Sequence, residues 1–103
     1  MNKEITTDQL AAKLNAGDGL QLIDVRELDE WEDGHIAEAK HIALSELTER
    51  VSELDESHSP IYIICRSGNR SSKACGYLTA QGYDVINVLG GMMSWTGDVV
   101  TGD

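Results

Sequence analysis

A chain of 103 residues with 41% hydrophobic and 25% charged side chains has the composition of a globular domain and is long enough to bury a core of its own. Its formal net charge of -10 argues against nucleic acid or an anionic membrane surface as a partner, because both would repel it. No apolar run reaches the length of a secretory signal or a membrane span, so we expect a cytoplasmic protein with free thiols.

The first recognisable elements are a helix and a strand. Thr6 and Gln9 fit a capping box at the start of the helical stretch DQLAAKLNAG, which Gly17 can end. The apolar, partly alternating segment LQLIDV (20–25) then predicts a strand. The acidic segment that follows, 27–34, is predicted to be a loop with a helical turn.

The middle of the chain holds the most apolar stretch. Residues 40–43 predict a short strand, and Ser45 is a candidate N-cap for a second helix that extends to about Leu54. IYIIC (61–65) predicts a central strand that is buried on both faces of a sheet.

The last third of the chain continues the alternation, with a helix over 71–81, a strand over 84–89 and a short helix over 91–95. Strands that alternate with helices at this spacing predict an α/β domain with a mainly parallel sheet. Ligands of such sheets bind beyond the carboxyl ends of the strands, and Cys65 lies at one of these ends.

Cys65 stands where the apolar strand changes abruptly into a polar loop. A junction between strand and helix gathers backbone N–H groups, and the helix adds the positive end of its dipole, so a sulfur there favours the thiolate form. Gly68 permits the tight turn that such a cradle requires. Ser67, Asn69 and Ser71 are small enough to hydrogen-bond locally and leave the sulfur accessible.

The charges near Cys65 differ from those of the whole chain. No Asp or Glu occurs between residues 57 and 83, whereas Arg66, Arg70 and Lys73 do. This distribution predicts a locally cationic patch that suits a small anionic substrate. The alternative is that Cys65 ends a buried strand only as a small hydrophobic residue. No Cys or His spacing is typical of a metal site.

CRSGNRS (65–71) resembles the active-site loop of the rhodanese family of sulfurtransferases. Three further stretches match the family in the same order, namely LIDVRELDEW (22–31), GHIAEAKHI (34–42) and NVLGGMMSW (87–95). The resemblance extends from about Thr6 to Trp95. It implies a single rhodanese domain over residues 1–103, with a three-layer α/β fold in which helices cover both faces of the sheet.

The resemblance also implies a catalytic cycle. Cys65 would be the nucleophile that takes a sulfane sulfur from a donor such as thiosulfate and holds it as a persulfide, without a cofactor. A thiol, cyanide or a protein acceptor would then take the sulfur, which is double-displacement covalent catalysis. Arg66 and Arg70 would bind the sulfonate end of thiosulfate, and the backbone N–H groups of 66–70 would hold the persulfide. The implied substrate-binding residues are Arg66, Ser67, Gly68, Asn69 and Arg70.

The resemblance gives other residues supporting roles. Asp24 and Arg26 match an aspartate–arginine pair of the family and are expected to hold the active-site loop, with an ordinary ion pair as the alternative. Ser71 is expected to support the loop as well. Cys75 is expected to be a buried bystander, and the double glycine at 90–91 is expected to allow a close approach of the backbone.

Two other functions stay open. In the related phosphatases a C-x5-R loop surrounds phosphate, whereas Arg70 gives C-x4-R here and Ser71 takes the later position; this disfavours phosphate or arsenate chemistry. The other alternative is a sulfur-relay or persulfide-binding module that serves a partner protein. The acidic segment 27–33 is the candidate docking surface for such a partner.

Overall fold

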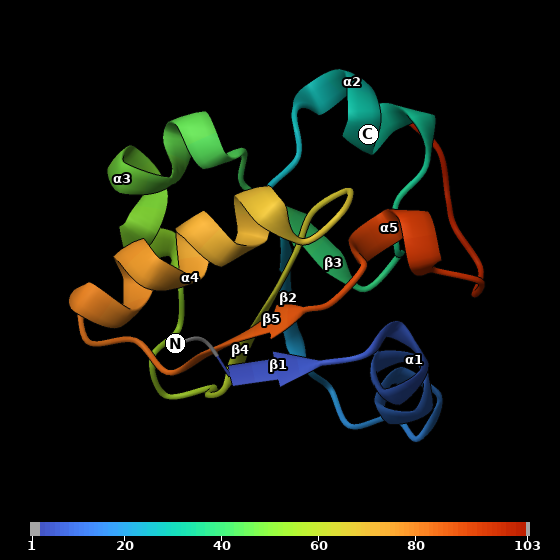
Figure 1. Ribbon diagram of the computed structural model, residues 1–103, viewed down its shortest axis with the longest axis horizontal. Coiled ribbons are helices and arrows are strands. Elements are labelled where there is room, and N and C mark those ends of the chain that lie inside the picture. The colour runs from blue at the N-terminus through green and yellow to red at the C-terminus, as the bar shows by residue number, and fades with distance from the viewer. Residues whose placement is uncertain (1–2, 103) are drawn as a thin grey trace.

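The computed structural model describes residues 3–102, and a parallel five-stranded sheet lies at the centre of the molecule (Figure 1). Every neighbouring pair of strands in the order β1-β5-β4-β2-β3 is parallel, which confirms the expected α/β class. The strands are β1 (Lys3–Ile5), β2 (Gln21–Asp24), β3 (Ala39–His41), β4 (Ile61–Ile64) and β5 (Val85–Val88).

Helices cover both faces of the sheet, as expected of a three-layer domain (Figure 1). Within residues 3–102, no helix is both long enough and apolar enough to cross a membrane. The helices are α1 (Thr7–Asn15), α2 (Leu28–Asp33), α3 (Leu47–Arg50), α4 (Asn69–Ala80) and α5 (Gly91–Ser94), with 3-10 turns η1 (Leu44–Glu46) and η2 (Val51–Glu53) on either side of α3.

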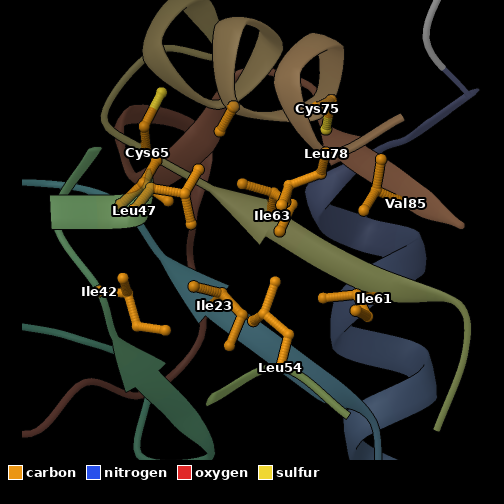
Figure 2. Close-up of a cluster of buried hydrophobic side chains, with 12 residues drawn as sticks. Ile23, Ile42, Leu47, Leu54, Ile61, Ile63, Cys65, Cys75, Leu78 and Val85 are labelled. Atoms are coloured by element: carbon orange, nitrogen blue, oxygen red, sulfur yellow. The ribbon is translucent and has the colours of Figure 1, made fainter. Parts of the chain in front are cut away.

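Each face of the sheet has its own hydrophobic core, and β4 contributes to both. Side chains alternate along a strand, so Ile61 and Ile63 pack toward α3 and α4, whereas Tyr62 and Ile64 pack toward α1 and α5. All four residues of β4 are buried, which confirms a central strand buried on both faces. Figure 2 shows the core beneath α4, to which Cys65 also belongs.

Two of the predicted helix starts were wrong. Ser45 does not cap a helix, because it lies inside η1 and its side chain makes no capping hydrogen bond. The other start lies two residues earlier than predicted, since α4 begins at Asn69 with Gly68 as its N-cap. Asn69 and Arg70 are therefore in the first turn of α4 rather than in the loop that precedes it.

The strand predicted over 40–43 lies slightly earlier, as β3, and the helix predicted to extend to Leu54 is divided into η1, α3 and η2. The other predicted elements match their sequence signals within a residue or two. Reciprocal hydrogen bonds join Thr6 and Gln9 in the expected capping box. The strand β1 was not predicted, because it is three residues long and only Ile5 of these is buried. Its pairing with β5, at one edge of the sheet, defines it as a strand.

Candidate active site

Cys65 follows β4 directly, at the carboxyl end of the strand that lies between β2 and β5. Its sulfur accepts a hydrogen bond from the backbone N–H of Gly68, with 3.1 Å between the nitrogen and Sγ. Gly68 has a φ of 102°, a left-handed conformation that favours glycine and directs its N–H back toward the sulfur. The chain thus forms a narrow turn between the end of β4 and the start of α4.

The surroundings of Cys65 favour the thiolate. Burial by itself raises the pKa of Cys65, but hydrogen bonding with the Ser71 side chain and with the backbone N–H groups of Ser71, Gly68 and Ser67 outweighs it, so the pKa lies below its ordinary value. The residue is 0% exposed. The expectation that small neighbours leave the sulfur accessible was therefore wrong.

A buried polar chain continues from Cys65 to β5. The Cys65 sulfur lies 3.3 Å from Ser71 Oγ, and the Ser71 hydroxyl donates to Asn87 Oδ1. Asn87 in turn directs its Nδ2 toward the carbonyl oxygen of Gly68, at 3.4 Å. A hydroxyl has only one proton. While Ser71 donates it to Asn87, Ser71 can accept a hydrogen bond from the thiol form of Cys65. To donate to the thiolate form, the Ser71 hydroxyl must turn away from Asn87.

Asn87 was not identified from the sequence as part of the site. It is 3% exposed on β5, and its only sequence signal is an amide among the apolar residues of that strand. A buried amide requires hydrogen-bond partners, and in this fold Ser71 and Gly68 provide them.

The start of α5 fixes the backbone of the Cys65 loop. Met92 donates its N–H to the carbonyl oxygen of Cys65 at 2.8 Å, and Met93 donates to that of Arg66 at 2.9 Å. A Cβ at Gly91 would lie 2.3 Å from the Cys65 carbonyl oxygen, so only glycine fits there. This contact confirms the close backbone approach expected of the double glycine.

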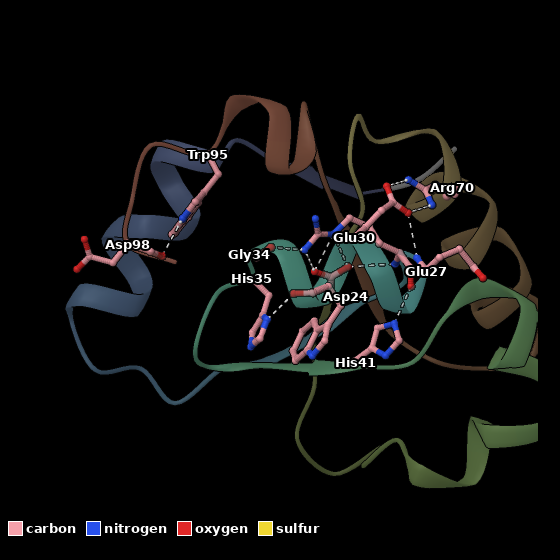
Figure 3. A network of polar contacts seen from close by, with 11 residues as sticks. Asp24, Glu27, Glu30, Gly34, His35, His41, Arg70, Trp95 and Asp98 are labelled. Atoms are coloured by element: carbon pink, nitrogen blue, oxygen red, sulfur yellow. Dashed lines mark hydrogen bonds and ion pairs between the residues drawn. The ribbon is translucent and has the colours of Figure 1, made fainter. Parts of the chain in front are cut away.

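Arg70 does not stand free beside the sulfur. Its two terminal nitrogens donate to the two carboxylate oxygens of Glu30, at 2.6 and 2.8 Å (Figure 3). The pair joins the first turn of α4 to α2. The hydrogen bond from Arg70, opposed by burial and helped by the backbone N–H of Glu27, lowers the pKa of Glu30 to about 2.

A cavity of about 320 Å³ lies beside the Cys65 loop. Its walls are Arg26, Glu30, Asp33, Arg66, Met92 and Met93. The predicted cationic patch was therefore wrong. The sequence around Cys65 lacks carboxylates, but folding brings two of them from α2, so the cavity carries two guanidinium and two carboxylate groups.

Asp24 and Arg26 form a buried ion pair below this cavity. Arg26 donates to both carboxylate oxygens of Asp24 at 2.8 to 3.0 Å, and the two side chains are 7% and 1% exposed for Arg26 and Asp24. The remaining hydrogen bond described for the Arg26 guanidinium goes to the carbonyl oxygen of Gly34, at 2.8 Å. The pair thus holds the end of α2 through Gly34, whereas the sequence had suggested that it would bond to the Cys65 loop.

Aromatic stacking between Trp31 of α2 and two histidines holds this helix in place. The rings of Trp31 and His35 stack with their centroids 3.5 Å apart, and His35 Nδ1 lies 2.7 Å from the carbonyl oxygen of Trp31. His41 stacks on the same indole ring and approaches the carbonyl oxygen of Arg26. These contacts place the acidic face of α2 against the site.

Cys75 is buried in the core beneath α4, as expected of a bystander (Figure 2). Burial, and secondarily the charge of Cys65, raise the pKa of Cys75 to about 12, so it is protonated at neutral pH. Both cysteines are free thiols. Among residues 3–102 no group of three His, Cys, Asp or Glu side chains could hold a metal ion.

Known proteins resemble this chain over almost its whole length. A family model described as "Rhodanese-like domain" matches residues 6–98. The Bacillus subtilis (strain 168) protein named "Putative sulfurtransferase YtwF" is 45% identical over 96 residues, which are 93% of this chain and 92% of that protein. "Putative sulfur carrier protein YrkF" of the same strain is 43% identical over 95 residues, 91% of this chain but only 51% of its own length.

A solved structure shares the fold. The crystal structure of a rhodanese-like domain protein from Staphylococcus aureus superimposes with a TM-score of 0.90 at 37% sequence identity. The match covers 98% of this chain and 99% of that one. The layers and strand order described above are thus those of a known fold.

Proposed function

The chain belongs to the Rhodanese-like domain family, and on that premise we propose that it transfers sulfane sulfur through a persulfide on Cys65. The observation that carries the proposal is the sulfur cradle at the start of α4. Gly68 N–H and Ser71 Oγ lie 3.1 and 3.3 Å from the Cys65 sulfur. Such a cradle lowers the pKa of a thiol and supports a negative charge on its sulfur, which are the requirements for a nucleophile of this kind.

The proposed cycle has two displacements and needs no cofactor. The Cys65 thiolate attacks the outer sulfur of thiosulfate, the S–S bond of the donor breaks, and sulfite leaves with the electron pair. The enzyme then holds a persulfide anion. An acceptor thiolate or cyanide attacks the outer sulfur of this persulfide, which forms a new persulfide or thiocyanate and returns Cys65 as thiolate.

Different residues around the loop are proposed to bind the persulfide and the sulfur donor. Gly68 and the neighbouring N–H groups of Ser67 and Asn69 are proposed to hold the persulfide, and Arg66, which is exposed and lines the cavity, to meet the donor. Arg70 is proposed to contribute to donor binding as well, once Glu30 releases it. A cycle that depends on a reduced thiol fits a reducing compartment such as the cytoplasm.

A sulfur-relay module that serves a partner protein is the second candidate. It is favoured by the similarity to a protein named as a sulfur carrier, although this chain spans only about half of that relative. In a relay, the persulfide on Cys65 would form rapidly from a partner and slowly from thiosulfate.

The proposal is tested by the formation of thiocyanate from thiosulfate and cyanide, measured for the wild type, Cys65→Ser and Cys75→Ser. We expect Cys65→Ser to lose at least about 100-fold in rate, because the nucleophile is gone, and Cys75→Ser to stay within about twofold. Circular dichroism checks that each variant is folded. Substantial turnover by folded Cys65→Ser would contradict a cycle through this residue.

A further inference from the structure

Glu30 occupies the face of Arg70 that an anionic donor would need. Both terminal nitrogens of Arg70 donate to the Glu30 carboxylate, and the two side chains are 32% and 27% exposed. A sulfonate presents to a guanidinium the same pair of oxygen acceptors as a carboxylate. The same edge of Arg70 cannot bind both, so an anion that uses this edge must first displace Glu30.

The competing carboxylate is always charged under ordinary conditions. The pKa of Glu30 is lowered to about 2, chiefly by its hydrogen bond with Arg70, so Glu30 is ionised throughout the neutral range. Displacing it also leaves a second negative charge beside the incoming anion. The cost of displacement therefore falls on every donor that binds Arg70 through an oxyanion group, and it does not fall on a donor that makes no contact with Arg70.

The neighbouring cavity does not offer a second free guanidinium pair in place of Arg70. Of the two guanidinium groups that line this cavity, that of Arg26 is already bound to Asp24 and Gly34. Arg66 is left as the cation for which no ion pair is described among residues 3–102, and Asp33 opposes it from α2. Met92 and Met93 add an apolar wall, and Met93 is 68% exposed.

We infer that Glu30 is a specificity-determining residue that competes with anionic sulfur donors for Arg70, so that the site favours donors whose sulfane sulfur is carried on an uncharged organic group. This inference rests on the proposed function, since it concerns the donor of the same Cys65 cycle. Thiosulfate is still a substrate, but Glu30 raises the thiosulfate concentration that half-saturates the site.

Glu30→Gln is a suitable test variant because it removes the charge and preserves the helix. Glu30 accepts a hydrogen bond from the backbone N–H of Glu27 at 3.0 Å, and glutamine can keep this capping interaction with its amide oxygen. The matched control is Glu32→Gln, an exposed position on the same helix. It removes the same charge without changing the partner of Arg70.

The experiment measures the rate of persulfide formation on the protein against donor concentration, by rapid quench and mass spectrometry. The two donors are thiosulfate and the persulfide of 2-mercaptoethanol, whose carrier is uncharged. A partly exposed, bidentate ion pair shifts a competing equilibrium by about 3- to 10-fold. We expect Glu30→Gln to lower the half-saturating thiosulfate concentration by this factor and to change that of the organic persulfide, which has no oxyanion group for Arg70 to bind, by less than about twofold.

Sulfate provides a second readout, since it is an anion that donates no sulfur. It should inhibit the reaction of the organic persulfide at lower concentrations in Glu30→Gln than in the wild type, whereas Glu32→Gln should match the wild type. Equal changes for both donors, or equal changes in the two variants, would overturn the competition. Failure of both donors to load sulfur on any variant would instead overturn the proposed function, so the two failures are distinguishable.

Discussion

The reactivity of Cys65 is predicted to depend on which group receives the Ser71 proton. In Ser71→Ala the thiolate loses a hydrogen-bond donor, so the pKa of Cys65 rises. A hydrogen bond to a charged group is worth about 1.5–3 kcal/mol. The lower end applies here, because Asn87 competes for the same proton, and about 1.5 kcal/mol corresponds to roughly a tenfold smaller thiolate population at neutral pH.

Asn87→Leu should act in the opposite direction. Leucine has nearly the same shape but accepts no hydrogen bond, so the Ser71 hydroxyl is left with the Cys65 sulfur as its acceptor. The thiolate is then stabilised, and the pKa of Cys65 falls below that of the wild type. A role of both residues in packing alone would instead change the two variants in the same direction.

The assay is the rate of alkylation by iodoacetamide as a function of pH. The rate in Ser71→Ala should be about tenfold lower at pH 7 than in the wild type. The two rates should converge at high pH, where Cys65 is ionised in both proteins. The high-pH limit also reports any change in access to the buried sulfur. Cys75 contributes little, because its pKa is raised to about 12. Profiles that shift together, or not at all, would refute the role of the Ser71 proton.

Three further predictions concern the frame of the site. Gly91→Ala places a Cβ 2.3 Å from the Cys65 carbonyl oxygen at a φ of +55°, so urea denaturation should show a loss of at least about 2 kcal/mol, and an unchanged midpoint would contradict the close contact. Asp24→Asn should cost about 3–5 kcal/mol by leaving the buried Arg26 charge unpaired, and the double change Asp24→Leu with Arg26→Met should cost less; a larger loss in the double variant would contradict this. The pKa of Glu30 is lowered from 4.5 to about 2, so its contribution to stability is complete above about pH 5 and is lost as the pH falls through 2. The free energy of unfolding should therefore fall less steeply on acidification in Glu30→Gln than in the wild type, and an identical slope would argue against the ion pair with Arg70.

The sequence predicted those features that depend on local pattern. The apolar run before Cys65 marked a central strand, and the abrupt polar change after it marked the end of the sheet at which ligands bind. Gly68 was recognised as a turn residue because it follows this change in polarity. The structure gives it a left-handed backbone conformation, which few residues other than glycine adopt.

Features that depend on contacts between distant segments could not be predicted in this way. Arg70 and Glu30 are separated by 40 residues, and only the packing of α2 brings the acidic segment against the Cys65 loop. The charge pattern along the chain therefore suggested a cationic patch where the fold makes a mixed one. Asn87 was missed because a single amide in a strand does not reveal its partner until β5 is placed beside β4.

Intact-protein mass spectrometry, after brief incubation with thiosulfate and with the persulfide of 2-mercaptoethanol, shows directly whether Cys65 carries sulfur. We expect the wild type to gain the mass of one sulfur atom, cyanide or dithiothreitol to remove it, and folded Cys65→Ser to gain none. A wild type that gains no sulfur from either donor, or a Cys65→Ser variant that gains it as readily, would show that Cys65 is not the sulfur carrier.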